Sequence, residues 1–524
     1  MKKTKRALMI YPEFPINSYW NFRHLHDLLL PKNRFGYPKS NQPPLGLLCI
    51  APMLSEYYGR DNVRLIDMNV QPLTDADLDW ADHIYTSAML TQSESLAEVA
   101  QRAKKRGKTV IGGGPAMSAD MPDFDYIFMN ESEKVLQKFL DEFLFGGTPA
   151  KIQRGGRPEA HEFFRPDYSF IEPKHYASIP VQFSRGCPHD CEFCDITVRY
   201  GRAMRTRELD SFFADLDQLY SLGWHGQVFI IDDNFIGKPA AALELLKRLE
   251  PWQKERKYPF EFFTQASVTL AEEKYEELLK AFAPAGFSMI FLGIETPNEA
   301  SLKETNKMQN VRGTLSLPEK IHRIQEVGQM LILGGFIVGF DSDGKDIFDS
   351  QINFIEKIRV PTPMVGLLHP LPHTRLDARL KSEGRLSQAE EATGSVAGGL
   401  EIIYQPKLLT KEELHDGYIR ILSKVYLDMS GFYGRCLASL KYIAAPPFSG
   451  AIKKEDVIGI MRLLREEGFK GNYRWQFWRY ILSALFFHRR KVPYALRWAA
   501  YGLHFNRQTK RMFAEEGIQD RPAA

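Results

Sequence analysis

Short apolar segments alternate with helical patterns along most of this chain, and this alternation constrains the fold more than any other feature. In the first part of the chain, strand-like runs occur at 6–11, 63–67, 81–88, 109–112 and 125–129. The helical patterns between these runs cover 45–58, 93–106 and 132–145. Strands separated by helices form a parallel, doubly wound sheet that binds ligands beyond the carboxyl ends of its strands. We therefore expect an α/β, Rossmann-like domain over residues 1–150.

A second alternating stretch follows a segment rich in glycine and proline. We interpret that segment, residues 151–178, as a linker. Strand-like runs then occur at 180–184, 227–231, 260–264, 288–294, 331–338 and 364–368. Six β/α units predict a partial (β/α)6 barrel of the TIM type over residues 179–384, with its site at the carboxyl ends of the strands.

From residue 385 the alternation stops, and helical patterns predict a mainly helical domain over 385–524. Between Gly468 and Gly517 the chain has ten Lys or Arg residues, interleaved with aromatic residues such as Trp475 and Trp478. This pattern is typical of a basic amphipathic helix on an anionic membrane surface. The alternative is a helical cap that packs its aromatic face on the barrel and leaves its arginines in solvent.

Composition excludes several classes of protein. Of the 524 residues, 44% are hydrophobic and 25% charged, which is ordinary for a globular protein and excludes collagen-like and disordered chains. A net charge of +3 gives no reason to expect a nucleic-acid partner. No apolar stretch is long enough for a transmembrane helix, and Pro12 interrupts the apolar run after the basic N-terminus, so we expect a cytoplasmic location.

Three of the five cysteines fall within eight positions just after the first strand of the second domain: Cys187, Cys191 and Cys194. In a reducing compartment such a cluster indicates a metal site or catalysis, not a disulfide. Three soft thiolates at this spacing suit an iron–sulfur cluster, and three ligands for four irons leave one iron open for chemistry. The alternative is a structural zinc site completed by His189 or a distant residue, although no second Cys pair is present.

This Cys-x3-Cys-x2-Cys loop after the first barrel strand resembles the hallmark of radical S-adenosylmethionine (SAM) enzymes. The resemblance implies that Cys187, Cys191 and Cys194 bind a [4Fe–4S] cluster whose open iron chelates SAM. It also implies that SAM is cleaved to a 5′-deoxyadenosyl radical, with an electron supplied by a reductase or flavodoxin-type donor. Phe193 would shield the adenine side of SAM.

Further segments at the strand ends resemble the SAM-binding segments of that family. Gly293-Ile294-Glu295 is similar to the segment beside the ribose and methionine of SAM. The run Gly335-Phe336-Ile337-Val338-Gly339 is similar to the segment that contacts the adenine. Gln265 ends the third strand and is a candidate polar contact. Many family members have a Gly-Glu motif at the end of the second strand, where this chain has Asp232-Asp233. These carboxylates either bind the methionine amino group or cap the next helix.

A Rossmann-type domain ahead of such a barrel resembles the cobalamin-binding subfamily. The segments that carry this likeness are 43–47, Asp67-Met68-Asn69-Val70 and Gly113-Gly114-Pro115. The Asp-x-His-x-x-Gly motif that supplies a cobalt ligand in other cobalamin proteins is absent. The resemblance therefore implies a cobalamin bound with its base displaced and no histidine under the cobalt, and it makes His24, His26 and His83 surface or packing residues.

The C-terminal segments 371–372, 383–386 and 472–478 resemble the tail of hopanoid C-2 methylase-type members. The whole resemblance implies a cobalamin-dependent radical SAM methyltransferase that acts on an unactivated carbon of a small molecule or a hopanoid-like lipid. It also allows peripheral contact with the inner face of the membrane. Two alternatives stay open: a related enzyme that performs rearrangement, cyclisation or oxidation, and a non-catalytic corrinoid or iron–sulfur binding protein.

Overall fold

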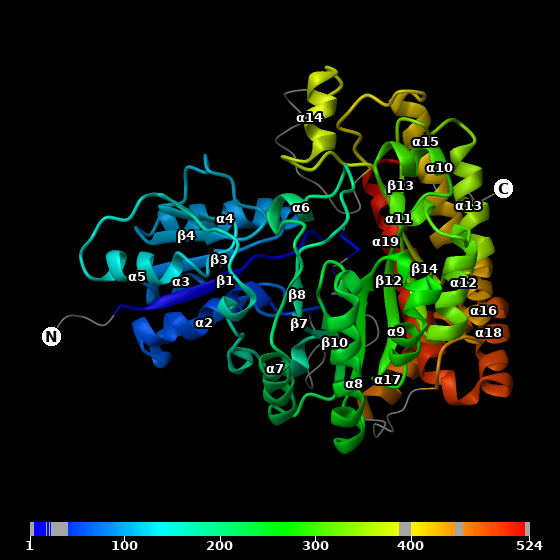
Figure 1. Cartoon of the computed structure of the whole chain (residues 1–524), viewed down its shortest axis with the longest axis horizontal. Coiled ribbons are helices and arrows are strands. Elements are labelled where there is room, and N and C mark those ends of the chain that lie inside the picture. The colour runs from blue at the N-terminus through cyan, green and yellow to red at the C-terminus, as the bar shows by residue number, and fades with distance from the viewer. Residues whose placement is uncertain are drawn as a thin grey trace.

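The computed structural model describes residues 5–16, 18–19, 21, 40–386, 400–445 and 454–518 (Figure 1). Two of the histidines considered above, His24 and His26, lie outside these residues.

The N-terminal domain is built on a six-stranded parallel sheet with the strand order β2-β1-β3-β4-β5-β6. The strands are β1 Ala7–Tyr11, β2 Val63–Asp67, β3 His83–Ser87, β4 Thr109–Gly113, β5 Tyr126–Met129 and β6 Ile152–Arg154. Helices α2 (Leu45–Tyr58) and α5 (Leu136–Leu144) pack on one face, and α3 (Asp75–Trp80) and α4 (Ser93–Lys104) pack on the other. The predicted doubly wound α/β fold is confirmed, and the strand order reverses between β1 and β3.

The segment expected to be a linker contributes regular structure. Strand β6 pairs in parallel with β5, and three 3₁₀ turns follow: Ala160–Glu162, Tyr168–Phe170 and Pro173–His175. The glycines and prolines of this segment thus shape the turns after the sixth strand.

The second domain is an open six-stranded parallel sheet with the order β14-β13-β12-β11-β10-β7, which confirms the partial barrel. Its strands are β7 Ser178–Val181, β10 Gly226–Ile230, β11 Phe260–Ala266, β12 Phe287–Glu295, β13 Leu331–Val338 and β14 Thr362–Leu367. The covering helices are α7 Leu209–Ser221, α8 Pro239–Glu255, α9 Glu276–Ala281, α12 Leu317–Gly328 and α13 Ile347–Ile358. Alternate strand residues such as Phe262, Ile290 and Ile332 belong to the large core that these helices share.

The C-terminal region is helical, as expected. It contains α15 Lys411–Leu422, α16 Met429–Ser439, α17 Lys454–Leu463, α18 Arg474–Phe487 and α19 Val492–Glu515. No helix in the described ranges is both long enough and apolar enough to cross a membrane.

Helix α19 covers the inner face of the barrel sheet, where the other set of alternate strand residues points (Figure 1). Met289 and Leu331 form a core with Trp498, and Arg497 forms an ion pair with buried Glu261 at 2.7 Å. Toward its C-terminal end, Gln508 donates a hydrogen bond to the carbonyl of Ile16 at 2.8 Å. This part of the basic tail therefore packs on the barrel, as the helical-cap alternative predicts.

Candidate active site

The cysteine loop, residues 186–194, begins where β8 (Ser184–Arg185) ends, at the carboxyl end of the barrel. Two carboxylates after β10 hold its start. Asp232 accepts hydrogen bonds from the backbone N of Phe183 at 2.8 Å and from the Ser184 hydroxyl at 2.6 Å. Asp233 accepts from the backbone N of Gly186 at 3.3 Å. The helix-cap interpretation of these carboxylates is wrong, because α8 has no side-chain cap.

Burial changes the acidity of both carboxyl groups. It raises the pKa of Asp232 to about 6 and the pKa of Asp233 to about 7. Hydrogen bonds from the loop oppose these shifts by stabilising the charged form.

The far side of the cysteine loop is held by residues distant in sequence. The backbone N of Glu192 donates to the carbonyl of Thr305 at 2.9 Å, and its carboxylate pairs at 2.7 Å with Arg379 of α14 (Arg375–Ser382). Asn306 and Arg375 both donate to the carbonyl of Asp190, at 2.9 and 2.6 Å. These contacts fix the loop from two further elements of the fold.

The surroundings of the thiols suit metal-bound sulfur. The Gln309 amide donates to the Cys191 sulfur at 3.2 Å, and the Asn234 amide lies 3.9 Å from the Cys187 sulfur. Hydrogen bonds to sulfur are characteristic of iron–sulfur sites. Burial raises the pKa of the Cys194 thiol to about 12, so its thiolate form depends on a bound cation. The donor set therefore fits a [4Fe–4S] cluster.

Within the described part of the chain, no three His, Cys, Asp or Glu side chains converge closely enough to hold a single metal ion. Each thiolate of a [4Fe–4S] cluster binds a different iron, so its sulfurs stand farther apart than the ligands of one ion.

Sequence reasoning missed Lys307, which lies next to two of the candidate SAM residues, Glu295 and Phe193. Its Nζ is 2.5 Å from Oε1 of Glu295 and 5.7 Å from the centre of the Phe193 ring. Burial alone would lower the pKa of Lys307, but Glu295 and the Cys191 sulfur raise it above its usual value. A Cβ atom on Gly293 would lie 2.6 Å from Oε1 of Glu295 and 2.8 Å from Nζ, so a larger residue would have to displace the ends of both side chains. No motif marks Lys307, and only its position in a polar segment after the fourth barrel strand offered a signal.

The other candidate SAM residues lie on the inner face of the barrel sheet. Gln265 pairs in register with Phe291, Gly293 with Gly335, and Ile337 with Gly366. Because side chains alternate along a strand, these positions lie on the same face of the sheet as the residues that α19 covers. Helix α19 covers that face nearer the amino ends of the strands, and the candidate residues lie nearer the carboxyl ends. Gln265 is half-buried and close to the carboxyl edge of β11.

Gly339 forms a tight turn after β13, with φ at +103°. Asp343 accepts hydrogen bonds from the backbone N atoms of Gly339 and Phe340, both at 3.0 Å. The Tyr404 hydroxyl donates to the Gly339 carbonyl at 2.6 Å. This segment is therefore held from both sides, and Phe340 places its ring 6.0 Å from that of Phe193.

In the first domain, Asp67 and Asn69 organise the ends of β1 and β2. Asp67 accepts from the Asn69 side-chain amide at 2.8 Å and from the Tyr176 hydroxyl at 3.1 Å. Asn69 in turn donates to the carbonyl of Pro12 at 3.0 Å and accepts from the backbone N of Phe14. Both side chains thus shape the edge where the strand order reverses.

The glycine segment after β4 lies against the cysteine-bearing domain. Gly114 has φ at +93°, and a Cβ atom there would lie 2.5 Å from the Ser87 hydroxyl, so the turn requires glycine. A Cβ atom on Gly113 would be 3.8 Å from Phe128, an ordinary contact. The carbonyl of Pro115 accepts a hydrogen bond at 3.3 Å from Arg199 of α6 (Ile196–Arg199), just beyond the cysteine loop.

A buried ion-pair network joins the two domains beside the cysteine loop. Arg185 pairs with Glu131 and Glu133, both at 2.6 Å, and Arg205 pairs with Glu131 at 2.7 Å. All four side chains are about nine-tenths buried or more. The carboxyl edges of the two sheets are therefore fixed relative to each other.

His83 is a packing residue, as expected. The Tyr58 hydroxyl lies 2.6 Å from its Nδ1, and its ring packs against Phe143. Burial lowers its pKa to about 4.

A cysteine loop of this spacing at the carboxyl end of a parallel partial barrel defines a radical SAM enzyme. The family model described as the radical SAM superfamily matches residues 181–346, and a domain of unknown function (DUF4070) matches 374–517. A radical SAM domain implies SAM and a [4Fe–4S] cluster as cofactors, which decides against the zinc alternative.

Two curated relatives match nearly the whole chain. An uncharacterised methyltransferase of Synechocystis sp. is 34% identical and covers 98% of this chain and 94% of its own length. The hopanoid C-2 methylase of Rhodopseudomonas palustris is 30% identical, with coverage of 92% and 90%. This chain belongs to the family of radical SAM methyltransferases that includes hopanoid C-2 methylase.

Solved structures share the fold. The radical SAM methyltransferase TsrM from Kitasatospora setae, with cobalamin and a [4Fe–4S] cluster bound, matches with a TM-score of 0.59 at 12% identity, over 95% of this chain and 99% of that one. The cobalamin-dependent SAM radical enzyme OxsB, with aqua-cobalamin and SAM bound, matches with a TM-score of 0.57 at 16% identity, over 99% and 82%.

Proposed function

We propose that this protein is a cobalamin-dependent radical SAM methyltransferase that methylates an unactivated carbon of a hopanoid-like lipid. The observation on which the proposal rests is the fixed contact between the residues that flank the cysteine loop and the carboxyl edge of the first sheet. Arg199 donates a hydrogen bond to the Pro115 carbonyl, and Arg185 and Arg205 form ion pairs with Glu131. A cofactor on each edge would then face the same substrate.

In this proposal Cys187, Cys191 and Cys194 would hold the cluster, which would supply the electron for cleavage of SAM. Lys307 fixes the Glu295 carboxylate at the carboxyl end of β12 and places a positive charge next to the thiolates. Phe193 and Phe340 form an aromatic pair next to Lys307. The half-buried Gln265 and the backbone of Gly293, Ile337 and Gly339 line the adjacent inner face of the barrel.

Cobalamin, which supplies the methyl group in this proposal, would bind at the carboxyl edge of the first sheet. That edge is the switch point of a doubly wound sheet, where such folds bind large ligands. Asp67 and Asn69 hold its first loop, while Gly113, Gly114 and Pro115 hold the loop that contacts the second domain. His83 is buried beside α2 and α5, so it is not available as a cobalt ligand.

A lipid substrate is supported by the 30% identity with hopanoid C-2 methylase over nearly the whole chain. A lipid substrate also gives a reason for peripheral contact with a membrane. The electron donor in the proposal is a reductase or flavodoxin-type protein.

A coproduct assay tests the proposal. Anaerobically reconstituted protein receives SAM, hydroxocobalamin and a strong reductant, with and without a hopanoid-containing lipid extract. We expect 5′-deoxyadenosine and S-adenosylhomocysteine to rise together when the extract is present. The Cys191→Ala variant should form neither product above background, whereas Cys436→Ala, at another buried cysteine in α16, should retain activity. A rise in 5′-deoxyadenosine alone would favour the non-methylating radical enzyme, and no product at all would favour the binding protein.

A further inference from the structure

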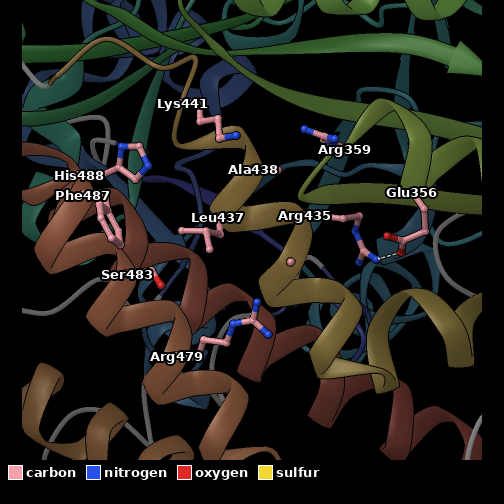
Figure 2. A pocket seen from close by; sticks show the side chains of 11 residues that line it. Glu356, Arg359, Arg435, Leu437, Ala438, Lys441, Arg479, Ser483, Phe487 and His488 are labelled. Carbon is pink, nitrogen blue, oxygen red and sulfur yellow. Dashed lines mark hydrogen bonds and ion pairs between the residues drawn. The ribbon is translucent and has the colours of Figure 1, made fainter.

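A basic hollow, seen from close by in Figure 2, opens between helices that lie on the side of the barrel away from the first domain in Figure 1. It lies between α16 and α18 at the end of α13, and its volume is about 670 Å³. We call it the α16–α18 pocket. Its lining residues with ionisable side chains are Glu356, Arg359, Arg435, Lys441, Arg479 and His488.

The charges in the α16–α18 pocket do not balance. Arg435 is almost completely buried and pairs with Glu356, the carboxylate among the lining residues, as the dashed line in Figure 2 marks. The remaining cations, Arg359, Lys441 and Arg479, are exposed, and no carboxylate in the described ranges pairs with them. The pocket therefore presents three uncompensated positive charges to whatever enters it.

The helix that forms one wall of the pocket also carries an exposed aromatic stripe. Trp475, Phe486 and Phe487 of α18 are 75%, 78% and 80% exposed. The spacing of Trp475, Arg479, Leu482 and Phe486 places them on one helical stripe, and Arg479, Ser483 and Phe487 form the adjacent stripe, which lines the pocket. Apolar rings and cations thus lie side by side on one exposed face.

Helix α18 has no acidic residue to repel an anionic surface, and Arg489, Arg490 and Lys491 follow it directly. Acidic residues nearby are already engaged. Glu466 pairs with Lys470 and Arg507, and Glu467 accepts a hydrogen bond from Tyr433.

We propose that the α16–α18 pocket binds the phosphate head group of an anionic phospholipid while Trp475, Phe486 and Phe487 enter the interfacial layer of the membrane. Interfacial helices combine aromatic rings with basic residues in this way, and cations near an anionic leaflet add electrostatic attraction that falls with salt. The chemistry of the surface favours this occupant, because a phospholipid supplies both an anion for the three cations and an apolar layer for the rings. The proposal does not depend on the methyltransferase reaction.

Vesicle co-sedimentation of the full-length chain tests the proposal. We expect binding to vesicles of phosphatidylcholine mixed with phosphatidylglycerol, weaker binding at high salt, and little binding to phosphatidylcholine alone. Arg479→Glu combined with Lys441→Glu should weaken the partition by more than about tenfold, since each basic residue near such a surface contributes about fivefold. Phe486→Ser combined with Phe487→Ser should weaken it at every salt concentration.

The matched control is Lys105→Glu, an exposed lysine at the end of α4 in the first domain, which should bind like the unaltered protein. Equal binding by the Arg479 and Lys441 double variant would overturn the proposal. Binding of glycerol 3-phosphate to the pocket, without any binding of the protein to vesicles, would also overturn the proposal and identify a soluble phosphate ligand. Because the readout is binding, failure here is distinguishable from failure of the coproduct assay.

Discussion

The ammonium group of Lys307 lies 2.5 Å from the Glu295 carboxylate, and both side chains are at least 87% buried. Glu295 ends the fourth barrel strand with φ at +66°, a conformation that is rare for residues other than glycine. The Gln351 amide donates to its carbonyl at 3.2 Å, so backbone and side chain are both held. This pair links the strand end to the cysteine loop, where Lys307 also faces Phe193.

Replacing Lys307 with Met should abolish 5′-deoxyadenosine formation and destabilise the barrel. Removal of one partner of a buried ion pair leaves an uncompensated charge and typically costs about 3–5 kcal/mol. Product analysis and thermal unfolding followed by circular dichroism check both effects. Lys303→Met removes an exposed pair with Glu299 and should change stability by less than about 1 kcal/mol. Similar effects of the two substitutions would contradict the role assigned to Lys307.

Replacing Asp232 with Ala should reduce the iron bound after anaerobic reconstitution by more than half. The variant leaves the backbone N of Phe183 and the Ser184 hydroxyl without their buried acceptor, at a cost of about 1–3 kcal/mol for each group. Iron analysis and the cluster absorption band provide the measurement. Asp210→Ala, at an exposed residue on α7, should retain full iron content. Full iron content in the Asp232 variant would show that the loop does not need this support.

Replacing Glu131 with Ala should loosen the contact between the domains. Arg185 and Arg205 would lose a buried partner, and the expected cost is again about 3–5 kcal/mol. Limited proteolysis should then cut faster within residues 155–177, which connect the two sheets. Asp75→Ala removes exposed pairs with Arg102 and Arg106 and serves as the control. An unchanged cleavage rate for Glu131→Ala would mean that other contacts hold the domains together.

Replacing Gly339 with Ala should destabilise the protein by about 2–4 kcal/mol. The positive φ strains any other residue, and the new methyl group would overlap the Tyr404 hydroxyl and lie 2.9 Å from the Leu414 side chain. Gly156→Ala, where a methyl group would meet nothing within 4 Å, should leave the thermal midpoint unchanged. Equal midpoints for the two variants would contradict the tight turn described after β13.

Asp67 should make stability depend on pH. Burial raises its pKa from 3.8 to about 6, so the folded state holds the proton more tightly than the unfolded state. Its contribution to stability therefore falls as pH rises from about 4 to 6 and is constant above that range, a total loss of about 3 kcal/mol. Thermal midpoints measured between pH 4 and 7 should show a smaller slope in Asp67→Asn than in the wild type, and the slope that remains comes from groups such as Asp232 and Asp233, whose pKa values are also raised. Asp61→Asn, at an exposed position, should keep the wild-type slope. If Asp67→Asn also kept the full wild-type slope, Asp67 would not be the source of this pH dependence.

Local patterns were sufficient to predict both parallel sheets, because the hydrophobic periodicities of strands and helices are visible among residues close together in the sequence. The cysteine loop was equally accessible, since its three thiols lie within eight positions. The contacts that hold the loop could not be predicted, because the residues that form them are remote in the chain. Glu192 and Arg379 are 187 residues apart, and Cys191 and Gln309 are 118 apart. Strand β6 was missed because its three residues lie in a segment whose glycines and prolines indicate turns.

The position of α19 has a consequence for biosynthesis. Residues 492–515 follow all the barrel strands in the chain, yet they cover Met289 and Leu331 on the inner face of the barrel sheet. Domains generally fold from the N-terminus as they are made, so the first sheet can form early. The barrel interior can close only after α19 has been synthesised, which leaves an interval in which chaperones and cluster-assembly proteins can reach it.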